Sequence, residues 1–168
     1  EGLRPNQVEA GDDLARRQVE HYALYDAMCQ REGVVDFAEL LLRSFELLAQ
    51  HEGLREHYRR RFSHLLVDEF QDTNVLQYKW LRLIAGERTA VFAVGDDDQS
   101  IYSWRGAEVA NILRFEKDFP GAKIIRLEQN YRSTPHILAA AAGVISGNKD
   151  RLGKTLWTDV ETGEKVRL

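Results

Sequence analysis

The sequence is poor in cysteine and contains no long apolar run. Cys29 is the single cysteine among 168 residues, so the chain can form neither an internal disulfide nor a structural zinc site built from paired thiols. The longest nearly unbroken apolar stretch, residues 137–145, is far shorter than the roughly 20 residues of a membrane-spanning helix. We therefore expect a cytoplasmic protein with no membrane partner.

Positive charge is not in excess either. The chain has 23 Lys and Arg against 27 Asp and Glu, a net charge of -4, which excludes a generally polycationic nucleic-acid binder. The most basic stretch holds Arg55, Arg59, Arg60 and Arg61, and it fits either phosphate contacts or an ordinary solvated face. The length and the 43% hydrophobic share suffice for one domain with a core, or for parts of several domains.

The first 61 residues have the pattern of an all-helical unit. Apolar residues recur at three- and four-residue intervals over residues 12–31, and Gly33 follows as a stop signal. Asp36 is placed to cap a second helix, with Glu39 reaching back toward the cap, and residues 54–61 predict a short basic helix. The expected buried stripe of the second helix is Phe37, Leu40, Leu41, Phe45 and Leu48.

The next part of the chain predicts a parallel sheet, and hence an α/β fold. Short apolar runs at residues 64–67 and 90–94 are typical of buried strands, and residues 75–85 between them have helical spacing. This order is a βαβ unit with a parallel strand pair. Farther along we expect helices over 107–117 and 135–146, and a third strand over 123–127.

Both predicted strands end in carboxylates. Asp68 and Glu69 follow the first strand, and residues 96–98 are three aspartates after the second. Because open parallel sheets bind ligands at the carboxyl ends of their strands, these acids are expected to share one crevice. One carboxylate can then hold Mg²⁺ and the next can activate a water for nucleotide hydrolysis. The alternative is that the acids only end the strands at a solvated surface.

Three strings in fixed order add to this pattern. They are DEFQDT at residues 68–73, GDDDQSIYSWRGA at 95–107 and QNYRST at 129–134. Together they closely resemble motifs II, III and IV of superfamily 1A DNA helicases of the UvrD/PcrA/Rep type. The similarity extends to VDFAELL at 35–41 and RLGK at 151–154.

This resemblance implies a role in ATP hydrolysis for five residues. Asp68 would be the magnesium-associated carboxylate, and Glu69 would activate the attacking water. Gln99 would sense the γ-phosphate or that water, since an amide can both donate and accept hydrogen bonds. Arg132 would approach the γ-phosphate from the second motor domain, and Tyr131 would stack on the adenine. The implied cofactors are ATP and Mg²⁺.

The resemblance also implies contacts with single-stranded DNA. Tyr102 and Trp104 are two positions apart, so in an extended segment they point the same way, as in platforms on which unpaired bases stack. Arg105 would link this contact to the ATP site. Packing in a core is the alternative for both aromatic residues.

The string GKT at residues 153–155 looks like the end of a phosphate-binding P-loop but does not fit one. Asn148 stands where that loop needs its first glycine, and the string follows a predicted helix rather than a strand. A chain without a P-loop holds half a nucleotide site, and phosphoryl transfer needs several groups at once. We therefore expect a central helicase fragment that is inactive alone.

The resemblance implies a partial P-loop NTPase, or RecA-like, fold in three parts. Residues 1–61 would end a helical insertion subdomain (1B-like), residues 62–127 would form the second half of motor domain 1A, and residues 128–168 would open motor domain 2A. The parent protein would be a 3'-5' DNA helicase acting on single-stranded DNA and duplex junctions, with DNA repair proteins as partners. The alternatives are a non-catalytic DNA-binding or interaction module, and a two-metal nuclease built on the same acids.

Overall fold

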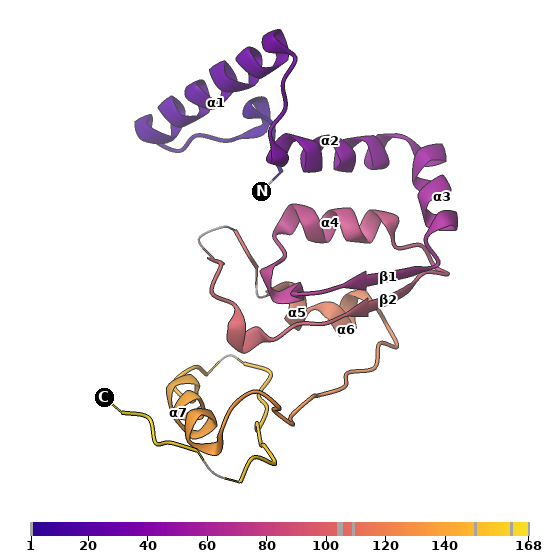
Figure 1. Cartoon of the computed structure of the whole chain (residues 1–168). Helices are drawn as coiled ribbons and strands as arrows, with labels where there is room; N and C mark the ends of the chain where they lie inside the picture. Colours follow the sequence, from indigo (N-terminus) through magenta and orange to yellow (C-terminus); the bar gives the residue numbers. More distant parts are fainter. Residues whose placement is uncertain (1, 104–105, 109, 150, 162, 168) are drawn as a thin grey trace.

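The structure is a computed structural model that describes residues 2–103, 106–108, 110–149, 151–161 and 163–167. Its N-terminal part is helical, as predicted (Figure 1). The Asp12 carboxylate accepts a hydrogen bond from the backbone N–H of Ala15, which caps the first long helix. Gly33 ends that helix in the left-handed region, at φ 66°. The elements of this part are η1 (Pro5–Gln7), α1 (Asp13–Glu32), α2 (Phe37–Gln50) and α3 (Glu52–Arg61).

The buried stripe predicted for α2 is partly wrong. Leu42 and Leu48 are the buried residues of this helix, whereas Phe37 is 91% exposed and Leu40 is 54% exposed. Helix α2 packs against α4. The apolar face that the helical spacing predicts is wider than the part of α2 that α4 covers. Glu39 does not reach back to the cap, because its carboxylate pairs with Arg4 and Arg43 instead.

The predicted βαβ unit is confirmed. Strand β1 (His64–Val67) pairs in parallel with β2 (Ala90–Ala93), and α4 (Val75–Ile84) connects them. The register places His64 opposite Ala90 and Val67 opposite Ala93. Asn74 caps α4 through a reciprocal pair of hydrogen bonds with Gln77.

The third predicted strand is wrong. Residues 123–127 form no strand, and Ile125 and Leu127 are 66% and 79% exposed. The apolar composition of this segment predicted a strand, but no neighbouring strand in the described residues offers it a ladder partner. The segment runs along the outside and leads to the lobe around α7 (Figure 1). The remaining elements are η2 (Phe70–Asp72), η3 (Asp97–Gln99), α5 (Ala110–Leu113), α6 (Phe115–Asp118) and α7 (Pro135–Ile145).

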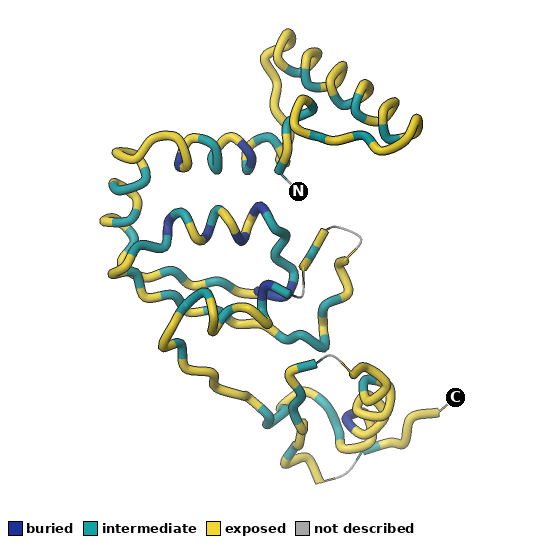
Figure 2. The backbone as a smooth tube through the Cα atoms, turned by 180° about the vertical axis from the view of Figure 1, so that it is seen from behind, coloured by how far each residue is buried: buried dark blue, intermediate teal, exposed yellow. Residues whose placement is uncertain are grey.

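The core lies on one face of the two-stranded sheet. Phe70, Tyr78 and Leu81 form its buried centre, with partly buried side chains from β1, β2, α5 and α6 around them. Burial and a hydrogen bond to Asp118 raise the pKa of Tyr78 to about 12. The opposite face exposes Leu66 (77%), and every residue of β1 and β2 is intermediate or exposed (Figure 2). No helix in the described residues is both long and apolar enough to span a membrane.

Candidate functional site

The two strand ends lie side by side, as a parallel pair requires. The N–H of Val94 donates to the carbonyl of Val67 at 2.8 Å, and the N–H of Phe70 donates back to the carbonyl of Val94 at 2.9 Å. The backbone that follows β1 is therefore tied to the backbone that follows β2. This places Asp68 and Glu69 at the same edge of the sheet as the aspartates at 96–98.

A buried amide completes the link between the strand ends. The side chain of Gln71 is 1% exposed. Its Nε2 donates to Glu69 Oε2 at 2.8 Å, and its Oε1 accepts from the N–H of Asp96 at 3.0 Å. Glu69 itself is the only non-glycine residue at positive φ in the described part of the chain (φ 49°, ψ 43°), a conformation that costs roughly 1 kcal/mol or more and clusters at functional sites.

Asp68, the predicted magnesium ligand, lies at the end of β1, and no group of three or more His, Cys, Asp or Glu residues in the described part of the chain is arranged to hold a metal ion. Asp68 is exposed, and its Oδ1 accepts from the N–H of Glu69 at 2.9 Å. Its Oδ2 has no hydrogen-bond partner among the described residues. Magnesium in nucleotide sites is held by one or two carboxylates together with phosphate oxygens and water, so a strand-end carboxylate with a free oxygen fits the ion. Asp72 Oδ1, one turn on, is buried and also lacks a partner in the described structure.

Gln99 closes the short helix η3 beside this edge. Its Nε2 donates to Asp96 Oδ2 at 2.7 Å, which leaves its carbonyl oxygen for another donor. Burial acts to raise the pKa of Asp96, but hydrogen bonds from Lys154 and Gln99 outweigh it and hold this pKa below its usual value. Asp96 is therefore ionised and fully engaged by its neighbours.

The segment at residues 151–154 clasps the three aspartates. Arg151 binds both oxygens of Asp98, at 2.8 and 2.5 Å, and this pairing raises the pKa of Arg151. The N–H of Leu152 donates to Asp97 at 2.7 Å, and Lys154 pairs with Asp96. The clasp joins η3 to the lobe that carries α7 (Figure 1), and Lys154 serves as an ion-pair partner here rather than in a P-loop.

Tyr131 and Arg132 are exposed on that lobe. Asn130 Oδ1 accepts from the N–H groups of Arg132 and Ser133, at 3.0 and 2.7 Å, and this turn presents Arg132. The Tyr131 ring is 83% exposed, and its hydroxyl donates to Gln129. In the described residues, no hydrogen bond or ion pair joins the guanidinium of Arg132 to Asp68, Glu69 or Gln99.

The predicted DNA-contact residues lie between η3 and α5 in the sequence. Trp104 and Arg105 lie outside the described residues. Tyr102 is 38% exposed, and its carbonyl accepts from the N–H of Ala107. An antiparallel bridge between Asn74 and Ala107, and a bond from the N–H of Glu108 to the carbonyl of Thr73, tie the end of this loop to the segment after η2.

The basic stretch of α3 has structural roles at two of its four arginines. Arg55 donates to the carbonyls of Leu48 and Ala49 at the end of α2. Arg59 donates to the carbonyl of Leu83 at the end of α4. These arginines cap helix ends, while Arg60 and Arg61 are exposed.

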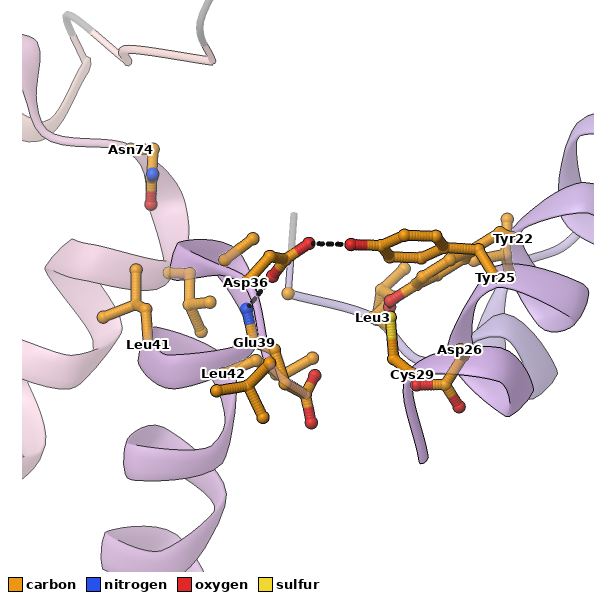
Figure 3. A pocket seen from close by; sticks show the side chains of 15 residues that line it. Leu3, Tyr22, Tyr25, Asp26, Cys29, Asp36, Glu39, Leu41, Leu42 and Asn74 are labelled. Carbon is orange, nitrogen blue, oxygen red and sulfur yellow. Dashed lines mark hydrogen bonds between the residues drawn. The ribbon is translucent and has the colours of Figure 1, made fainter. Parts of the chain in front are cut away.

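A cavity of about 450 Å³ lies between the N-terminal segment, α1 and the starts of α2 and α4, and none of the predicted site residues lines it. Its polar wall groups already have partners. Asp36 accepts from the N–H of Glu39 and from the Tyr25 hydroxyl (Figure 3). Arg4 pairs with Glu39 at 2.7 Å. These bonds join the N-terminal segment, α1 and α2, so we assign the cavity a structural role.

Comparison with known proteins identifies the family. The UvrD/REP helicase N-terminal domain family matches residues 1–120, which is most of the chain. The chain therefore belongs to this family, and its helicase resemblance is confirmed at that level.

The relatives are DNA helicases. Over 169 residues the chain is 56% identical to "DNA helicase II" of Escherichia coli (strain K12), covering 100% of this chain and 24% of that protein. It is 54% identical to "DNA helicase II" of Haemophilus influenzae over 100% of the chain. It is 44% identical to "ATP-dependent DNA helicase PcrA" of Staphylococcus aureus over 95% of the chain and 22% of that protein. The chain spans about a quarter of the length of the curated relatives it matches.

Proposed function

We propose that this chain is the central part of an ATP-dependent DNA helicase that moves 3' to 5' on single-stranded DNA and opens duplex junctions. The observation that carries this proposal is the joined pair of strand ends, where Glu69, Gln71 and Asp96 form one hydrogen-bonded unit with Gln99 beside it. The names of the relatives support the same activity. DNA repair is the proposed setting, with repair proteins as partners.

The proposed division into domains follows from the resemblance to UvrD/PcrA/Rep-type helicases. Residues 1–61 end a helical insertion, residues 62–127 belong to a first RecA-like motor domain of the P-loop class, and residues 128–168 open a second. Residues 151–154 of the second motor part contact the aspartates at 96–98 of the first. The P-loop and the later motifs would lie elsewhere in the full-length helicase.

Each proposed site residue has a chemical task that its geometry permits. Bound Mg²⁺ supplies positive charge that offsets the charge developing on the transferred phosphate. Asp68 would hold the ion with its carboxylate. Glu69 orients a water and accepts its proton through the oxygen that Gln71 leaves unbonded. Gln99 positions the same water or the γ-phosphate, and Arg132 adds its fork of donors from the second lobe.

Two other functions fit less well. A two-metal nuclease needs several free carboxylates, but Asp97 and Asp98 are taken by Leu152 and Arg151. A non-catalytic DNA-binding module does not explain why the buried side chain of Gln71 fixes the carboxylate of Glu69. Hydrolysis of ATP by the full-length helicase that single-stranded DNA stimulates would favour the helicase over both, and DNA cleavage without ATP would favour the nuclease.

The proposed DNA loop can be tested by substitution of Trp104. In the full-length helicase, Trp104→Ala should weaken single-strand binding by roughly 5- to 150-fold, because stacking of one base contributes about 1–3 kcal/mol. Fluorescence anisotropy with a labelled oligonucleotide measures this affinity. DNA-stimulated ATPase should fall while basal ATPase changes little.

Phe37→Ala is the matched control, since Phe37 is an aromatic residue that is 91% exposed outside this loop. It should leave DNA affinity unchanged. If Trp104→Ala instead reduces basal and stimulated ATPase equally and leaves DNA affinity intact, Trp104 packs in a core and the stacking role is wrong.

A further inference from the structure

Gln71 is the most deeply placed polar side chain at the strand ends. Only two polar residues are buried in the described part of the chain, Gln71 at 1% exposure and Asn111 at 3%. A buried amide that failed to bond both its ends would be costly. The partners of Gln71 decide its orientation, since an N–H of Asp96 requires the amide oxygen and the Glu69 carboxylate requires the amide NH₂.

The surroundings of Gln71 hold this orientation. A Cβ atom at Gly95 would lie 2.9 Å from Gln71 Oε1 and 3.2 Å from Phe70 Cβ. The backbone that follows β2 therefore approaches the amide so closely that a larger residue than glycine at position 95 would displace the amide. The same amide cannot turn over without placing its NH₂ against the N–H of Asp96.

Glu69 depends on this bond more than an ordinary surface acid would. Its backbone has the left-handed conformation at φ 49°, and its side chain bonds to Gln71 in η2. Its Oε2 accepts from Gln71 at 2.8 Å, and its Oε1 has no hydrogen-bond partner among the described residues. One carboxylate oxygen is thus fixed and the other is left for a reactant.

We propose that Gln71 is a positioning residue that holds the Glu69 carboxylate in its water-activating orientation and couples it to the end of β2. The N–H of Asp96 donates to Gln71, and the carboxylate of Asp96 accepts from Gln99 at 2.7 Å. Any shift of Asp96 therefore also shifts the Gln71 amide that orients Glu69. The two groups proposed to act on the attacking water therefore move together. This inference rests on the proposed ATPase function of the site.

Two changes at Gln71 separate its bonds. Gln71→Leu removes both hydrogen bonds at similar volume. Gln71→Glu retains an acceptor for the N–H of Asp96 but offers no donor to Glu69 and places a second carboxylate beside it. In the full-length helicase, both variants should reduce kcat for DNA-stimulated ATP hydrolysis by about tenfold or more, because small misplacements of catalytic groups cost up to roughly 100-fold. The Kd for a fluorescent ATP analogue should change less than about threefold.

Gly95→Ala provides an independent disturbance, because it pushes on the Gln71 amide without removing it. It should also reduce kcat. Asn111→Leu is the matched control, because Asn111 of α5 is also a buried amide and donates to the carbonyl of Thr73 at 3.0 Å. It should lower the melting temperature as much as Gln71→Leu does, but leave kcat per folded molecule unchanged.

Amide hydrogen exchange tests the geometry apart from turnover. Gln71→Leu should speed exchange at the N–H of Asp96, whereas Gln71→Glu should retain its protection. If the wild-type protein hydrolyses ATP and the Gln71 variants retain kcat while losing stability like Asn111→Leu, the positioning role is wrong. If the wild-type protein shows no DNA-stimulated ATPase, the proposed function itself fails.

Discussion

Glu69→Gln in the full-length helicase should reduce ATP turnover by about 10²- to 10⁴-fold, the range that general-base catalysis contributes. The replacement retains the size of the side chain and an oxygen that accepts the bond from Gln71, but it removes the basic carboxylate. ATP binding should remain near normal, because Asp68 and the remaining phosphate contacts are untouched. Steady-state ATPase assays and titration with a fluorescent ATP analogue measure the two quantities separately.

Glu87→Gln is a suitable control for charge, because Glu87 is an exposed acid in the turn between α4 and β2. This variant should behave as wild type in both assays. Unchanged turnover in Glu69→Gln would remove the water-activating role. A loss of ATP affinity as large as the loss of turnover would instead place Glu69 among the binding residues.

Arg132→Ala should have an effect of similar size. An arginine supplied from a second domain to a phosphate in transfer contributes roughly 10³-fold or more to kcat. The turn at Asn130 holds the backbone of Arg132, and the guanidinium makes no hydrogen bond or ion pair within the described residues, so it is available to a phosphate. We expect kcat to fall by roughly 10³-fold, with a much smaller change in nucleotide affinity, in single-turnover measurements.

Arg132→Lys should recover little of this activity, since an ammonium lacks the planar fork that binds two phosphate oxygens. Arg126→Ala is the control, because Arg126 is an exposed arginine six positions earlier. Normal turnover in Arg132→Ala would show that this arginine does not act in hydrolysis. Equal losses in Arg126→Ala and Arg132→Ala would point to general charge effects.

The elements that the sequence predicts well are those with strong local signals. The apolar runs at β1 and β2 end at acids, and α4 between them has helical spacing and a clear cap at Asn74. These features settle the βαβ unit, and its parallel pairing brings Asp68 and Asp96 to one edge. This part of the candidate site could therefore be anticipated without coordinates.

The features that the sequence did not predict depend on partners far along the chain. Glu39 has the spacing of a helix cap but pairs with Arg4, 35 residues away. Residues 123–127 have a strand-like composition, yet a strand forms only where a neighbour offers a ladder. The hydrogen bonds of Gln71 and Arg151 were not predicted either, because an amide in a motif and an arginine near the C-terminus carry no periodic signal. Their only sequence signal was membership in the strings DEFQDT and RLGK.

The central claim is that the ends of β1 and β2 form one metal and nucleotide site, and metal-directed cleavage tests it most directly. Fe²⁺ replaces Mg²⁺ in the full-length helicase with ATP, and hydrogen peroxide and ascorbate are added. The bound Fe²⁺ reduces the peroxide to hydroxide and a hydroxyl radical that cuts the backbone near the ion, and ascorbate reduces the resulting Fe³⁺ back to Fe²⁺. The account predicts ATP-dependent cuts at both residues 68–71 and 95–99, and their loss in Asp68→Ala. Cuts at neither segment, or at only one of them, would contradict it.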